Sequence, residues 1–210
     1  MNQNAPVLFE DKNGILSKLD TLEKVIIDLG CGDTKIQPDA IGVDVLDSPA
    51  VDVVGDARGV LGHILDSKVD AILSHHFMEH VGDVAELLSA IHRVLKIGGY
   101  TKITVPHFSN PYFYSDPTHK QFFGLYTFNY YATCNLFKRT VPSYSRVPGL
   151  ELEQAKLAFK SFPPNYMRHG FKKMLEVMVN ATNWTKEAYE ENLTGIFPCY
   201  EIQAVLRKVS

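Results

Sequence analysis

The sequence predicts an α/β protein with a Rossmann-like, three-layer α/β/α sandwich. An apolar run over residues 25–29 leads directly into a turn that carries Gly30 and Gly32, as a buried parallel strand does before a ligand-binding turn. Similar short apolar runs recur along the first half of the chain, over residues 41–44, 51–54, 70–73 and 100–105. Strands that alternate with helical connections form a mostly parallel sheet, and ligands bind at the carboxyl ends of its strands.

Length, charge and cysteine content restrict the class of protein. A chain of 210 residues is expected to form one domain, residues 1–210. The formal net charge of −3 argues against a nucleic acid as the partner and leaves a small molecule as the expected substrate. The longest apolar runs are too short for a membrane span, and three cysteines do not make a disulfide framework. A cytoplasmic location is therefore expected.

The clearest helix is expected over residues 77–95. Its apolar residues step by three and four positions, so they form one stripe that can lie on a sheet. Gly98 and Gly99 are expected to end this helix. A shorter helical piece is expected over residues 15–22, whereas residues 34–40 leave room for only a turn or two.

The pattern changes after Pro106. Residues 107–148 are rich in aromatic side chains, which predicts an inserted cap that binds substrate and has a helix near residues 120–131. The elements expected beyond the cap are a strand over residues 150–161, helices over 167–180 and 186–192, and a last strand over 200–208. The last strand alternates apolar and polar residues, as an edge strand with one solvated face does.

Three acidic residues stand at or near the ends of successive predicted strands: Asp28, Asp44 and Asp56. A carboxylate at a buried edge is costly unless it meets hydrogen-bond donors, so this repeated placement indicates a ligand rich in donors. Each aspartate alone is equally compatible with an ordinary turn or helix cap. A nicotinamide or flavin cofactor is disfavoured because its fingerprint requires a third glycine at the position of Lys35.

Five segments together resemble class I S-adenosylmethionine (SAM) dependent methyltransferases, in particular the large type 11 group. They are Asp28-Leu29-Gly30-Cys31-Gly32, Ile41-Gly42-Val43-Asp44, Val54-Gly55-Asp56-Ala57, Met78-Glu79-His80-Val81 and Arg93-Val94-Leu95-Lys96-Ile97-Gly98-Gly99. The resemblance covers roughly residues 25–106 and implies a seven-stranded sheet whose last strand is antiparallel. One departure is Thr34, which stands where the group has a third glycine.

This resemblance gives the candidate cofactor residues their expected roles. Asp44 would accept hydrogen bonds from both ribose hydroxyls, Asp56 would meet the adenine amino group, and Asp28 would orient the glycine turn and approach the methionine ammonium. Ser74 and His75 would lie near the methionine end. The complete expected SAM-binding set is Asp28, Gly30, Cys31, Gly32, Asp44, Val45, Asp56, Ala57, Ser74 and His75.

A metal site is a second hypothesis. His76, Glu79 and His80 would share one face of the predicted helix, and Glu-x-x-Glu-His at this place resembles the metal site of some O-methyltransferases. Here His76 replaces the first glutamate, and two imidazoles with a carboxylate suit a divalent transition metal better than magnesium. The alternative is a structural role for Glu79 and His80 between the helix and a loop.

Two histidines are candidates for the catalytic base. His107 directly follows the strand over residues 100–105, and His119 lies in the segment Asp116-Pro117-Thr118-His119. A side chain with a pKa near neutrality is suited to removing a proton from an attacking hydroxyl. The segment around His119 is equally compatible with a helix start that holds the cap in place.

The predicted function is methyl transfer from SAM to an oxygen or nitrogen nucleophile on a small or medium-sized substrate of sugar, lipid-linked or natural-product type. Two alternatives remain open. One is an RNA-directed methyltransferase, which needs a basic face lined with aromatic residues. The other is a SAM-binding protein or enzyme that does not transfer the methyl group.

Overall fold

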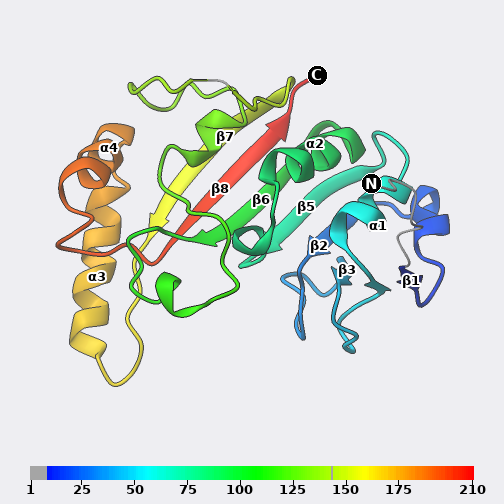
Figure 1. Ribbon diagram of the computed structural model, residues 1–210, viewed down its shortest axis with the longest axis horizontal. Helices are drawn as coiled ribbons and strands as arrows, with labels where there is room; N and C mark the ends of the chain where they lie inside the picture. Colours follow the sequence, from blue (N-terminus) through cyan, green and yellow to red (C-terminus); the bar gives the residue numbers. More distant parts are fainter. Residues whose placement is uncertain (1–8, 143) are drawn as a thin grey trace.

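The computed structural model describes residues 9–142 and 144–210, which fold around one eight-stranded sheet (Figure 1). The order across the sheet is β1-β4-β3-β2-β5-β6-β8-β7. The strands are β1 (Glu10–Asp11), β2 (Ile26–Leu29), β3 (Ile41–Asp44), β4 (Val53–Val54), β5 (Val69–His75), β6 (Leu95–Pro106), β7 (Leu150–Ala158) and β8 (Glu201–Lys208). This mixed α/β architecture confirms the predicted Rossmann-like class.

Strand directions agree with the predicted sheet. The pairs β4–β3, β3–β2, β2–β5 and β5–β6 are parallel, so their carboxyl ends share one edge. The last strand, β8, is antiparallel to both β6 and β7, as expected. The seven predicted strands are joined by β1, a two-residue strand that pairs antiparallel with β4.

The expected edge position of the last strand was wrong. β8 lies between β6 and β7, and β7 forms the edge of the sheet (Figure 1). The polar residues Gln203 and Arg207 of β8 are only half-buried, which explains the alternating pattern, but both sides of its backbone are hydrogen-bonded. Side-chain alternation reports the faces of a strand and carries no information about its neighbours.

The helical elements are η1 (Leu16–Thr21), α1 (Ala57–His63), η2 (Met78–His80), α2 (Val84–Val94), η3 (Phe113–Ser115), η4 (Thr127–Tyr130), α3 (Tyr166–Val179) and α4 (Asn183–Asn192). Helices α1 and α2 pack against each other over the main apolar core, to which α2 contributes Leu88 and Ile91. The opposite face of β2 and β5 carries a small separate cluster that includes Ile26 and Leu73. None of the described helices is long and apolar enough to cross a membrane.

The helix expected over residues 77–95 is shorter than predicted. Asp83 begins α2 by accepting a hydrogen bond from the Glu86 N–H at 2.9 Å, and residues 78–80 form the separate 3₁₀ turn η2. The two glycines expected as a helix end lie inside β6 instead, where Gly98 has a φ of +82°. They lie where the register between β5 and β6 shifts.

The helix expected near residues 120–131 was also wrong. Only the short 3₁₀ turns η3 and η4 form within the described part of residues 107–148. Phe123, Leu125 and Phe128 are each about 1% exposed and belong to the main core, so this segment packs into the domain. The Leu125 N–H donates to Glu190 of α4 at 2.8 Å, which replaces a helical hydrogen bond with a tertiary one.

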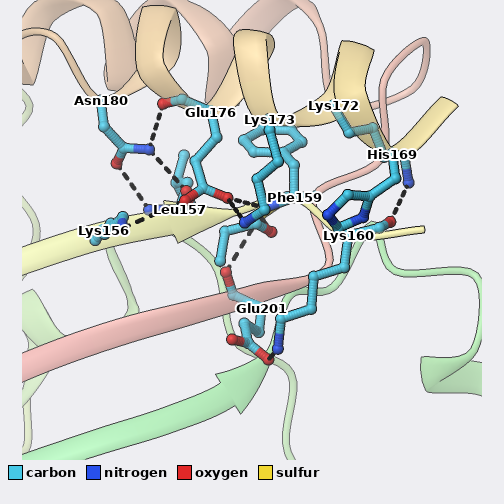
Figure 2. Close-up of polar contacts among 12 residues, drawn as sticks. Lys156, Leu157, Phe159, Lys160, His169, Lys172, Lys173, Glu176, Asn180 and Glu201 are labelled. Carbon is cyan, nitrogen blue, oxygen red and sulfur yellow. Dashed lines mark hydrogen bonds and ion pairs between the residues drawn. The ribbon is translucent and has the colours of Figure 1, made fainter. Parts of the chain in front are cut away.

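Helix α3 lies beside β7 with its polar side facing the strand. Asn180 bonds both the N–H and the C=O of Leu157, at 3.0 and 2.7 Å, and Glu176 accepts from the Phe159 N–H at 2.9 Å (Figure 2). Much of its apolar surface faces outward, and Met167 is 93% exposed. Hydrogen bonds therefore contribute more to the attachment of α3 than burial of an apolar stripe does.

Candidate functional site

The two glycines of the turn after β2 have different surroundings. Gly30 has a φ of +73°, and a Cβ built on it would lie 2.5 Å from the Cβ of Phe77. Gly32 has a φ of +54°, but open space surrounds the position where its Cβ would lie. Gly30 thus makes room for a protein side chain, whereas Gly32 leaves the backbone open to a ligand. Between them, burial and the charges of nearby acids raise the pKa of the Cys31 thiol to about 11.

Asp44 ends β3 beside this open turn. Its Oδ2 accepts from the Gly32 N–H at 2.9 Å, and its Oδ1 accepts from the Leu46 N–H at 2.9 Å. Each carboxylate oxygen has a second lone pair, so the group can accept two further hydrogen bonds. The next residue, Val45, is 67% exposed, which provides an apolar surface next to the carboxylate. This arrangement fits a ligand with paired hydroxyls and an adjacent flat ring.

Asp28 lies beneath the turn and is almost fully buried. Its Oδ2 accepts from the Ile36 N–H at 2.6 Å, a contact that ties β2 to the loop after the glycines. Its Oδ1 is buried and has no hydrogen-bond partner among the described residues. Burial raises the pKa of the Asp28 carboxyl, against the opposing effects of the Ile36 N–H and Lys35. An unpaired buried oxygen is costly, so this position suits a donor brought by a ligand.

Asp56 is placed by helix α1. Its Oδ1 accepts from the N–H groups of Arg58 and Gly59 at 3.1 and 3.3 Å, so it is the N-cap of that helix. The side chain is 54% exposed and faces Arg58, while Ala57 is buried. Capping accounts for the aspartate without a ligand, and contact with adenine stays a prediction.

The end of β5 brings Ser74 and His75 next to the turn, because Ser74 pairs with Leu29 across β2 and β5. The Ser74 Oγ is buried and lacks a hydrogen-bond partner among the described residues. His75 is exposed, and its ring lies 4.3 Å from that of His76. Partial burial and then the charge of His76 lower the pKa of His75, which keeps this imidazole neutral near pH 7.

A charged network follows β5 directly. His76 has a φ of +53°, uncommon for a residue other than glycine, and its Nδ1 and Nε2 lie 3.2 Å from Glu79 Oε1 and 3.4 Å from Glu201 Oε2. The same Glu201 oxygen accepts from Lys160 Nζ at 2.9 Å (Figure 2). Both glutamates are about 1% exposed. No sequence motif marks Lys160 or Glu201 as a member of this network.

The network alters the pKa values of its members. Burial alone would lower the pKa of His76, but the hydrogen bonds to Glu201 and Glu79 outweigh it and raise the pKa to about 9. Burial would raise the pKa of Glu201, yet His76 and Lys160 lower it to about 2. His76 is therefore an imidazolium near pH 7, held between carboxylates.

The predicted metal ligands do not share a helix face, because residues 78–80 form the turn η2. Two groups with metal-ligand spacing occur in residues 9–142 and 144–210: His75, His76 and Glu201, and Glu79, His80 and His119. The predicted trio is thus divided between them, and the His80 Nδ1 lies 2.9 Å from Thr118 Oγ1. Neither group contains the complete predicted trio, and a metal role for these residues stays a prediction.

The two candidate bases lie apart from each other. His107 is fully buried, with Nε2 at 2.9 Å from Glu190 Oε2 and Nδ1 at 2.7 Å from Ser109 Oγ. These contacts join the end of β6 to α4. His119 is half-buried, and its Nδ1 lies 2.9 Å from the Phe113 carbonyl oxygen. Each ring has a structural partner, and a catalytic role for either stays a prediction.

Comparison with known proteins finds a family model that matches part of this chain. Residues 27–103 match a family model described as a methyltransferase domain. The matched region contains the glycine turn, Asp44, Asp56, Ser74 and His75. No curated protein sequence matches this chain significantly.

Solved structures show the same fold. A SAM-dependent methyltransferase from Archaeoglobus fulgidus is 17% identical, with 92% of this chain and 93% of that one covered and a TM-score of 0.53. Phosphoethanolamine N-methyltransferase 2 from Haemonchus contortus, in complex with SAM, is 15% identical, and its TM-score is 0.50. That comparison covers 94% of this chain and 52% of the other, so this chain spans about half of the Haemonchus protein.

Proposed function

We propose that this protein, whose residues 27–103 match a methyltransferase domain model, transfers the methyl group of SAM to an oxygen or nitrogen nucleophile on a small or medium-sized acceptor. The observation that carries the proposal is the Asp44 carboxylate beside the open turn at Gly32. When bound, SAM supplies an electrophilic methyl group on a sulfonium whose leaving thioether needs no protonation.

The residues at the strand ends divide the work of binding. Asp44 accepts the ribose hydroxyls, and Val45 provides an apolar surface for the adenine. The oxygens of Asp28 and Ser74 that have no partner among the described residues would then be satisfied by the methionine ammonium. These contacts fix the cofactor, and positioning of the two reactants supplies most of the rate acceleration.

His75 is the side chain best suited to take the proton of the acceptor. It is exposed at the end of β5, and its lowered pKa leaves a nitrogen free to accept at neutral pH. His107 is fully buried and bonded through both ring nitrogens. We therefore propose His75 as the base in preference to His107, and a role for His119 stays a prediction.

Product analysis tests the proposal. Incubation with SAM and a metabolite extract should release S-adenosylhomocysteine and give a product heavier by one methylene, both measured by mass spectrometry. Release of methylthioadenosine in place of S-adenosylhomocysteine would contradict methyl transfer. Transfer to added RNA, with none to small molecules, would contradict the acceptor class.

The role of His75 has its own test. His75→Gln should lower kcat by about a hundredfold, within the usual range for a general base, and remove the acid limb of the pH–rate profile while SAM affinity stays within about twofold. His63→Gln, an exposed histidine on α1, is the matched control. Equal kcat values for the two variants would eliminate His75 as the base.

A further inference from the structure

A small cationic cavity opens between the end of β7 and the first turns of α3. Its volume is about 140 Å³. Since liquid water occupies roughly 30 Å³ per molecule, this space holds about five waters, enough for one ionic group of a ligand. Three cations line it: Lys160, Arg168 and Lys172. No aspartate or glutamate of the described part of the chain lines the cavity.

The cations of this cavity are incompletely neutralised. Lys160 pairs with Glu201, but within residues 9–142 and 144–210 the only partner of the Lys172 Nζ is a backbone oxygen, that of Lys160 at 2.8 Å (Figure 2). Arg168 is exposed and forms no ion pair with any described residue. Burial lowers the pKa of Lys172, and the charge of Arg168 lowers it further. Two like charges facing one small space are unfavourable unless an anion joins them.

Neutral groups in the same wall also favour an anion. The Ser161 Oγ is buried, lines the cavity and has no hydrogen-bond partner among the described residues. Asn165, at the start of α3, lines it too, and its side chain makes no capping hydrogen bond. The first N–H groups of a helix and a hydroxyl complement the oxygens of an anion.

Aromatic rings form the remaining wall. Phe162 lies 5.6 Å from Tyr200 and 6.4 Å from Tyr112, measured between ring centroids. The Lys160 ammonium lies 5.1 Å from the centre of the Tyr200 ring. An anionic group placed between the cations would therefore carry an apolar or aromatic portion against these rings.

The cavity connects to the proposed methyl-transfer site through two side chains. Lys160 binds Glu201, and Glu201 binds His76, the residue after the proposed base. We propose that the cavity holds a phosphate monoester group on the methyl acceptor, an inference that rests on the proposed function. A phosphate presents three oxygens and up to two charges, which matches donors on several sides of the cavity better than a carboxylate does.

Calorimetric titration with phenyl phosphate tests the cavity. Phenyl phosphate should bind more tightly than benzoate, phenol or inorganic phosphate, and its affinity should fall with added salt. Arg168→Ala should weaken it about tenfold or more. The control is Lys173→Ala, because Lys173 follows Lys172 on α3 but pairs with Glu176 and does not line the cavity. Equal affinity in the two variants, or benzoate bound as tightly, would overturn the phosphate site.

A second experiment tests the link to methyl transfer. A metabolite extract should support release of S-adenosylhomocysteine from SAM, and prior treatment of that extract with a phosphatase should abolish most of this release. Unchanged release after phosphatase would overturn the phosphorylated acceptor and leave the proposed function intact. If neither extract supports release while phenyl phosphate binds, the proposed function and the acceptor assignment fail, and the anion cavity alone remains.

Discussion

The two halves of the sheet edge stabilise their carboxylates in different ways. At the ends of β2 and β3, Asp28 and Asp44 accept hydrogen bonds from backbone N–H groups of nearby residues. At the end of β5 and the start of β8, Glu79 and Glu201 meet side-chain cations, among them His76. The first half offers lone pairs to a neutral or cationic ligand, whereas the second half balances charge within the protein. We infer that the first half binds cofactor and the second positions the acceptor.

Removal of Glu201 should destabilise the protein strongly. Glu201→Ala would leave His76 and Lys160 without their shared carboxylate, and loss of one member of a buried ion pair costs about 3 kcal/mol. Urea unfolding measures the change in free energy. Glu153→Ala, which breaks a half-exposed pair with Arg207, should cost less than about 1 kcal/mol. Equal losses would show that the network contributes no more than a surface pair.

The two glycines of the turn allow a sharper comparison. Gly30→Ala combines a left-handed backbone with a clash against Phe77, so it should lower the free energy of unfolding by about 3 kcal/mol. Gly32→Ala meets open space and should cost only about 1 kcal/mol, but it should weaken SAM binding. Calorimetric titration measures the affinity of each variant for SAM, and urea unfolding measures its free energy of unfolding. If Gly32→Ala binds SAM with unchanged affinity, the open turn is not the cofactor site.

The network of His76, Glu79, Glu201 and Lys160 should also make the free energy of unfolding depend on pH. The pKa of His76 is about 9, raised from an ordinary value of 6.5, so its contribution is complete below pH 6.5 and lost as the pH rises through 9. The loss should approach about 2 kcal/mol for this partly exposed group. The free energy of unfolding of His76→Gln, measured from pH 6 to 10, should lack this decline. A decline of the same size in the variant would assign it to another group.

The site residues that could be predicted from the sequence lie mainly at the ends of β2 and β3. The glycine turn and the placement of Asp28 and Asp44 depend on short motifs and apolar runs, and their contacts lie within a dozen residues of one another. Lys160 and Glu201 meet His76 only after the last strand inserts between β6 and β7. No local sequence pattern indicates that these three side chains come into contact.

The wrong prediction of a helix in the cap has a related cause. The Leu125 N–H, which a helix would use for its own hydrogen bonding, donates to Glu190 of α4. The Gly124 Cα lies so close to Glu190 that an added Cβ would be 2.7 Å from its Oε1. Tertiary packing overrides local preference there. The sequence predicts separate roles for His80 and His119, yet their ring centroids lie 5.0 Å apart. Tertiary packing brings these two residues together.

Calorimetric titration with SAM tests the central claim most directly. The protein should bind one equivalent of SAM or S-adenosylhomocysteine. Asp44→Ala should weaken binding about a hundredfold, equivalent to about 3 kcal/mol for hydrogen bonds to a charged acceptor, while Asp47→Ala, an exposed acid three residues away, should leave it unchanged. Absence of saturable binding to the folded protein, or equal affinity in the two variants, would contradict the account.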